Sequence, residues 1–165
     1  MAILPAVRSY RNVLTALLVV GSLTTACKNS GGSDPDIDPR DQYIGTYEGG
    51  ISSTLRVGTF EGTTQTGSAT IVITKAPNPK EVYVEVNASL GRPTPFKVTA
   101  ELSDAGFTVI DRNRDQMNVL GKTVEGEFRA TGVLSNNQIA ITATTEAVST
   151  GTTVRRDESF TGTKK

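Results

Sequence analysis

The chain has 165 residues, 17 Lys and Arg against 17 Asp and Glu, one cysteine and no histidine. Without histidine there is no imidazole base or imidazole metal ligand, and one cysteine cannot supply the several thiolates of a zinc site or iron–sulfur cluster. The balanced charge leaves no basic footprint for nucleic acid phosphates. We therefore expect no catalytic residues, no cofactor, no metal site and no nucleic acid partner, and a single domain with an ordinary apolar core.

The first 26 residues have the layout of an export signal. Arg8 and Arg11 precede an apolar run from Val13 to Leu23, and small residues follow that run. The run is shorter than the roughly 20 apolar residues that a membrane-spanning helix needs. The sequence therefore predicts a signal peptide at residues 1–26. The mature chain would then begin at Cys27, either lipidated or, after an ordinary cleavage, as a free thiol on a secreted protein.

The residues before Cys27 resemble the lipobox of bacterial lipoproteins. Thr25 and Ala26 are the small residues of that pattern, whereas Thr24 stands where the family has leucine and Leu23 lies one position further back. The resemblance implies a lipoprotein whose Cys27 carries acyl chains such as palmitate, each buried CH2 contributing ~0.8 kcal/mol to membrane binding. It also implies a place in the cell envelope of a Gram-negative bacterium, on the outer membrane and facing the periplasm or the surface.

Residues 27–42 are expected to form the lipidated cysteine and a flexible tether. Gly, Ser, Pro and Asp dominate this segment, and such a composition buries too little apolar surface to offset the entropy of ordering. Three alternating aspartates also resemble the start of a calcium-binding EF-hand loop: Asp34, Asp36 and Asp38. However, Pro39 occupies the place of the required glycine and Gly45 the place of the bidentate glutamate. Acidic residues soon after the lipidated cysteine are, alternatively, a sorting signal in some lipoproteins.

Residues 43–165 are expected to be entirely β. Segments with apolar and polar residues in alternation recur between Gly, Pro, Asn and Asp turns, and no segment has apolar residues at helical spacing. One apolar and one polar face per strand predicts an antiparallel meander of about eight strands, which can remove its edges by closing into a barrel. A β-sandwich is the alternative. The predicted strands are 43–56, 68–75, 81–89, 96–103, 106–112, 123–134, 138–147 and 152–163.

Residues at the two ends of this β segment resemble the lipocalin, or calycin, superfamily. Those barrels have a Gly-x-Trp near the start of the first strand that packs against an arginine from near the chain end. Gly45 matches the glycine, Tyr47 stands at the tryptophan position, and Arg156 matches the arginine. The resemblance implies a lipocalin-like barrel that Tyr47 and Arg156 help to close. The alternative is that Tyr47 is an ordinary core aromatic and Arg156 an exposed charge.

Inward charges are a second feature of the last predicted strand. Arg156 and Glu158 share a strand face with Val154 and Phe160, and a buried charge is costly unless it is paired or serves a ligand. Both residues are candidates for contact with the polar head of a ligand. They could also mark a strand end that leaves the barrel.

Two pairs of carboxylates on shared strand faces are the candidates for hydrolytic chemistry: Glu81 with Glu85, and Glu125 with Glu127. Only the second spacing, about 6.6 Å along a strand, suits an acid and base pair. We expect both pairs on the solvent face, with Arg129 as an ion-pair partner of Glu127.

The functional expectation is an envelope lipoprotein, anchored in a membrane through Cys27, with a non-enzymatic barrel that either binds a small, largely apolar ligand or fills its own interior and acts through its surface. A structural or adhesion module with an envelope protein as partner is the first alternative. A carboxylate-dependent hydrolase is the second.

Overall fold

The computed structural model describes residues 38–90, 95–104, 106–135 and 137–165. The predicted signal peptide, Cys27, Asp34 and Asp36 lie outside the described residues. The described part forms ten strands: β1 (Gly45–Val57), β2 (Phe60–Glu61), β3 (Gln65–Lys75), β4 (Glu81–Ala88), β5 (Phe96–Ser103), β6 (Gly106–Val109), β7 (Arg114–Val119), β8 (Lys122–Ser135), β9 (Gln138–Ser149) and β10 (Thr152–Lys164). None of these residues is helical, so no described helix has the length and apolar character to cross a bilayer.

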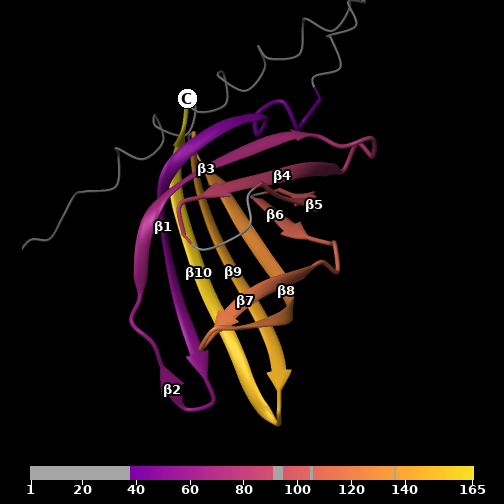
Figure 1. The fold of residues 1–165 in the computed structure, drawn as a ribbon. Helices are drawn as coiled ribbons and strands as arrows, with labels where there is room; N and C mark the ends of the chain where they lie inside the picture. Colours follow the sequence, from indigo (N-terminus) through magenta and orange to yellow (C-terminus); the bar gives the residue numbers. More distant parts are fainter. Residues whose placement is uncertain (1–37, 91–94, 105, 136) are drawn as a thin grey trace, which may run out of the picture. The chain divides into compact units, whose positions relative to one another are not determined.

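Eight of these strands close an antiparallel barrel, as the alternation predicts. The order around the sheet is β10-β9-β8-β6-β5-β4-β3-β1, and β1 pairs again with β10 (Figure 1). The closing pair is long, running from Tyr47 opposite Lys164 to Val57 opposite Val154. Because every strand of the ring has a partner on each side, the barrel avoids the unpaired edges that promote aggregation. The predicted all-β meander is confirmed.

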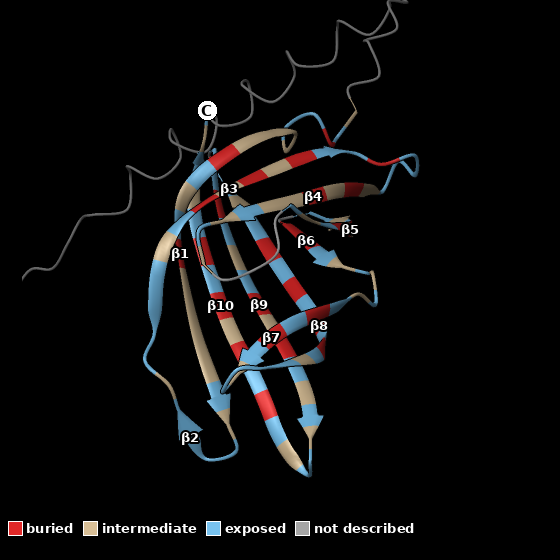
Figure 2. Cartoon of the chain, viewed as in Figure 1, coloured by how far each residue is buried: buried red, intermediate tan, exposed pale blue. Residues whose placement is uncertain are grey.

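Burial alternates along the strands with the predicted phase (Figure 2). Val82 and Val84 of β4 are buried, and Glu125 and Glu127 of β8 are exposed. The inward residues form one apolar core in which the rings of Phe96 and Phe128 meet edge to face, 4.9 Å apart. Its larger members are Tyr47, Ile51, Ile71, Ile73, Val82, Val84, Val98, Phe107, Phe128, Ile139 and Phe160.

Two strands are additions to the predicted set. β2 is a two-residue strand that pairs with the end of β1, and β7 forms a hairpin with the beginning of β8. The turn of that hairpin consists of Leu120 and Gly121, both at positive φ, which suits the tight turn between two twisted strands. β6 also ends at Val109 instead of the predicted Arg112.

The β7–β8 hairpin lies across β9 and β10 at one end of the barrel (Figure 1), where Asp115 of β7 bonds to Thr145 of β9 and Arg156 of β10. At the base of the hairpin, β8 approaches β9 closely at Gly126. A Cβ on Gly126 would lie 2.7 Å from the carbonyl oxygen of Glu146. A glycine at this position therefore permits the close contact between the hairpin and the barrel wall.

The folded unit also includes part of the segment that was expected to be a flexible tether. Residues Asp38 to Tyr43 form a turn, and the backbone N–H of Ile44 donates to the carbonyl of Arg40 at 3.1 Å. Arg40 is only 9% exposed because its side chain packs on the turn between β3 and β4. The expected tether boundary at Gln42 thus falls inside the folded part, since Arg40 forms hydrogen bonds with the barrel.

Candidate functional site

Arg156 and Glu158 both point into the barrel from β10, as their phase with Val154 and Phe160 predicts. They are 9% and 8% exposed, and the Nε atom of Arg156 lies 3.5 Å from a carboxylate oxygen of Glu158. Their register partners on β1 are Leu55 and Ser53. The two charges therefore lie inside the barrel wall, and the strand does not leave the barrel at this point.

Asp115 of β7 completes this charged cluster, and it is a residue that sequence reasoning missed. It is 3% exposed, and its carboxylate accepts hydrogen bonds from the guanidinium of Arg156 and, at 3.2 Å, from the hydroxyl of Thr145. Arg156 also donates to the carbonyl of Gln116 at 3.1 Å. Arg156 thus connects β10 to the hairpin that lies over it.

The signal for Asp115 was present in the sequence but was outweighed by its neighbours. Asp115, Met117 and Val119 alternate with polar residues, which is the pattern of a strand with one inward face. Turn-forming residues also occupy 113–115, and this segment lies in the gap between the predicted strands 106–112 and 123–134. In the structure β7 begins at Arg114, so that Asp115 faces inward beside Met117, which is 1% exposed.

A pocket of about 230 Å³ opens beside the charged cluster at this end of the barrel. Arg156 and Glu158 form its charged side, and the apolar side chains of Leu55, Leu90 and Met117 line it as well. Polar side chains complete the lining: Ser53, Thr63, Gln65 and Asn118. The pocket therefore offers both charged and apolar contacts within a small volume.

Tyr47 lies at the other end of the barrel, so the expected contact between Tyr47 and Arg156 does not form. Tyr47 pairs with Lys164, whereas Arg156 pairs with Leu55, eight residues further along β1. At ~3.3 Å per residue that separation is about 26 Å along the strand. Tyr47 is instead a core aromatic, 1% exposed, whose hydroxyl donates to the carbonyl of Tyr43 at 3.0 Å. Burial raises the pKa of the Tyr47 phenol above its usual value.

The carboxylate pairs lie on the outer wall. Glu127 is exposed and pairs with Arg129 at 3.0 Å, two positions along the same strand. Glu125, Glu127 and Glu146 line a shallow groove of about 470 Å³ together with Arg112 and Arg114. Both members of the Glu125–Glu127 pair are exposed, whereas general acids are commonly kept protonated near neutral pH by burial.

Glu81 and Glu85 are half-buried and take part in local hydrogen bonds. Glu81 accepts from the side-chain amide of Asn78 at 2.6 Å, and Glu85 accepts from that of Asn87 at 3.5 Å.

Asp38, the one described member of the aspartate trio, pairs with Arg40 and Lys75. Within the described ranges, no three His, Cys, Asp or Glu side chains gather closely enough to hold a metal ion.

Comparisons of the chain with known proteins did not identify a family or a relative. No protein-family model matches the chain, and no curated protein matches it. The structure is compatible with a lipocalin-like barrel because it is an all-β antiparallel ring of eight strands. The function must therefore be argued from the side chains.

Proposed function

We propose that the chain is an envelope lipoprotein of a Gram-negative bacterium, held in the outer membrane by acyl chains on Cys27, whose barrel binds a small amphipathic molecule without transforming it. The observation that carries the binding proposal is the pocket in which Arg156 and Glu158 lie beside Leu55, Leu90 and Met117. The anchor rests on the sequence pattern before Cys27.

The pocket refines the ligand class that the sequence suggested. A wholly apolar ligand would cover the charges of Arg156 and Glu158 and remove their remaining contact with water, which is unfavourable. A ligand with a polar head and a short apolar body would contact both sides of the pocket. Pockets for drug-sized molecules usually hold ≈ 300–1,000 Å³, so a pocket of about 230 Å³ suits a smaller molecule.

Native mass spectrometry of the protein purified from its own host tests the binding proposal. We expect a copurified small molecule that is lost in Thr63→Trp, because Thr63 is an exposed residue of the pocket lining. Thr64→Trp is the matched control, since Thr64 is also exposed but forms a hydrogen bond with Thr54. A wild-type protein without a bound molecule, or equal loss in both variants, would contradict the proposal.

The anchor is tested separately. Metabolic labelling with a palmitate analogue should mark the wild-type protein, and Cys27→Ser should remain unlabelled and leave the membrane fraction. Absence of label from the wild-type protein would contradict the anchor and leave the pocket proposal standing.

A protein-interaction module is the second candidate, and the outer surface favours it. The strand register places hydroxyl side chains in one row across five strands: Thr108, Thr131, Thr142, Ser159 and Ser52. Beside this row lies a groove of about 590 Å³ whose lining includes Arg129 and Arg155. If this surface is the functional one, Thr131→Arg should abolish cross-linking to an envelope protein, whereas Thr63→Trp should leave it unchanged.

A further inference from the structure

The three most exposed large apolar side chains of the described residues lie at turns on one end of the barrel. Leu120 is 98% exposed, Val148 73% and Phe60 70%. Leu120 belongs to the turn between β7 and β8, Val148 to the last residues of β9 before the turn into β10, and Phe60 to β2, which pairs with the end of β1. Because β10 begins beside the end of β1, the last two turns are neighbours (Figure 1). We call these three side chains the apolar tips.

The apolar tips lie at the end of the barrel that contains the pocket. Phe60 is opposite Val57, two residues beyond Leu55 of the pocket lining. Leu120 follows Asn118, which also lines the pocket, by two residues. Two of the three tips are therefore within a few residues of the pocket lining.

Leu120 is in addition a poor residue for the backbone that it occupies. Its φ is 50°, in the left-handed region that favours Gly, Asn and Asp. The turn between β8 and β9 has Asn137 at a similar φ of 64°, which is the ordinary choice. At position 120 the chain combines backbone strain with an apolar side chain in water, and nothing in the described part of the chain covers that side chain. Such a conflict with local preference is expected at functional positions.

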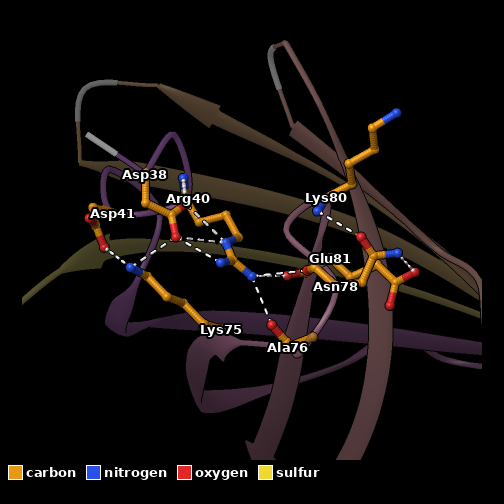
Figure 3. Close-up of polar contacts among 8 residues, drawn as sticks. All are labelled: Asp38, Arg40, Asp41, Lys75, Ala76, Asn78, Lys80 and Glu81. Carbon is orange, nitrogen blue, oxygen red and sulfur yellow. Dashed lines mark hydrogen bonds and ion pairs between the residues drawn. The ribbon is translucent and has the colours of Figure 1, made fainter. Parts of the chain in front are cut away.

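The opposite end of the barrel has a charged surface (Figure 3). There the turn before β1 is held by ion pairs: Arg40 lies 2.7 Å from Asp38, and Lys75 lies 3.0 Å from Asp38 and 2.6 Å from Asp41. The turn between β3 and β4 at that end has the exposed Lys80. Single exposed apolar residues are ordinary on protein surfaces, but here the most exposed ones gather at the pocket end.

We infer that the pocket end of the barrel docks on a lipid bilayer, with Phe60, Leu120 and Val148 inserted at the boundary between headgroups and acyl chains. The tips belong to separate turns and do not form one continuous face. A fluid bilayer accepts separate apolar side chains without a matching shape, whereas a protein partner would need a complementary recess for each of them.

The charges of the three turns agree with a bilayer as the partner. Arg56 and Glu61 form an ion pair at 3.3 Å and offset each other. Lys122 is the one further charged residue within the segments 56–62, 118–123 and 147–153, and it directly follows the Leu120–Gly121 turn. A cation beside an inserted leucine favours anionic headgroups. The inference uses only the surface of the barrel and does not depend on the proposed anchor at Cys27.

Tryptophan fluorescence tests the docking, because the chain has no tryptophan of its own. Phe60→Trp and Leu120→Trp place the probe at two tips. Val133→Trp is the matched control on the outer wall of β8, where Val133 is 58% exposed, and Lys80→Trp is the control at the opposite end. Each full-length protein, purified from the membranes of its host, is added to phosphatidylethanolamine–phosphatidylglycerol vesicles. Some of the lipid has brominated acyl chains, which quench tryptophan on contact.

We expect several-fold stronger quenching at positions 60 and 120 than at positions 133 and 80, with emission at shorter wavelength. Leu120→Asn, added to Phe60→Trp, should lower the quenching by about twofold because it removes apolar area from the contact. Asparagine favours positive φ, so the melting temperature should stay the same or rise, and lost quenching cannot then reflect unfolding.

Equal quenching at all four positions, or stronger quenching at 80 or 133, would overturn the docking. A blue shift at position 120 that grows with protein concentration in the absence of lipid would overturn it too, and would indicate a second copy of the chain as the partner. If the purified protein has no acyl chains, the proposed anchor fails. The same comparison at millimolar lipid then decides the docking separately: quenching confined to the tips supports it, and its absence contradicts it.

Discussion

Arg156 and Asp115 come from β10 and from the hairpin that lies over it, 41 residues apart in the chain, and form a buried hydrogen-bonded ion pair. Asp115 also accepts from Thr145, whose register partner on β10 is Arg156 itself. The pair thus joins three strands at the end of the barrel where the pocket lies. Arg156 therefore both lines the pocket and holds the hairpin in place through its hydrogen bonds to β7.

Asp115→Ala should lower the free energy of unfolding by about 3–5 kcal/mol, because it leaves the charge of Arg156 buried without this partner. Urea denaturation measures the change. Arg129→Ala is the control: it removes an exposed arginine from an ion pair on the outer wall and should change stability by less than ~1 kcal/mol. Similar losses in the two variants would show that the buried Arg156–Asp115 pair contributes no more to the free energy of unfolding than an exposed ion pair does.

A double-mutant cycle tests the separation of Tyr47 from Arg156. Tyr47→Phe removes the hydrogen bond to the carbonyl of Tyr43 and should cost about 1 kcal/mol. Arg156→Met should cost more, because it leaves Asp115 without its guanidinium partner. Since the two sites do not touch, the effects should add to within ~0.5 kcal/mol in urea denaturation. A larger coupling energy would indicate that Tyr47 and Arg156 interact as in lipocalins, contrary to the strand register.

The alternation of apolar and polar residues was sufficient to predict the ring of strands. Val82, Val84 and their counterparts on the other strands lie on the predicted face, because a one-residue register slip would place them all in water. The residues of β7 alternate in the same way, but the position of the hairpin over β10 was not predictable from alternation, since it depends on the contact between Asp115 and Arg156 that only the folded chain creates. The burial of Arg40 could not be predicted for the same reason: the partners of its side chain are backbone carbonyls of a distant turn, which carry no sequence signal.

Gly126→Ala tests the close contact between β8 and β9. A methyl group at this position would collide with the backbone of Glu146, so we expect a loss of about 1–3 kcal/mol in unfolding free energy. Gly50→Ala is the matched control, because a Cβ there would have its nearest neighbour 4.0 Å away. That substitution should be neutral or stabilising by up to ~1 kcal/mol, since glycine costs entropy within a strand. Equal destabilisation in the two variants would contradict the assigned role of Gly126.

The acid dependence of the ion pairs that Asp38 forms with Arg40 and Lys75 (Figure 3) provides the last test. The pKa of Asp38 is depressed in the folded protein, first by the side-chain hydrogen bond from Arg40 and then by the Arg40 backbone N–H, with Lys75 contributing further. A depressed carboxyl pKa contributes stability that is present above the unfolded value of ≈ 3.9 and is lost as the pH falls toward the folded value. Since the group is close to solvent, the informative measurement is its own titration, followed by NMR of the side-chain carboxyl carbon.

Arg40→Ala should raise the titration midpoint of Asp38 toward the unfolded value, because it removes the three hydrogen bonds that the guanidinium makes to the carboxylate. Lys75→Ala is the graded control and should raise the midpoint by a smaller amount, because Lys75 ranks below Arg40 among the causes of the shift. If the midpoint in Arg40→Ala stays as low as in the wild-type protein, Arg40 does not hold Asp38 in solution.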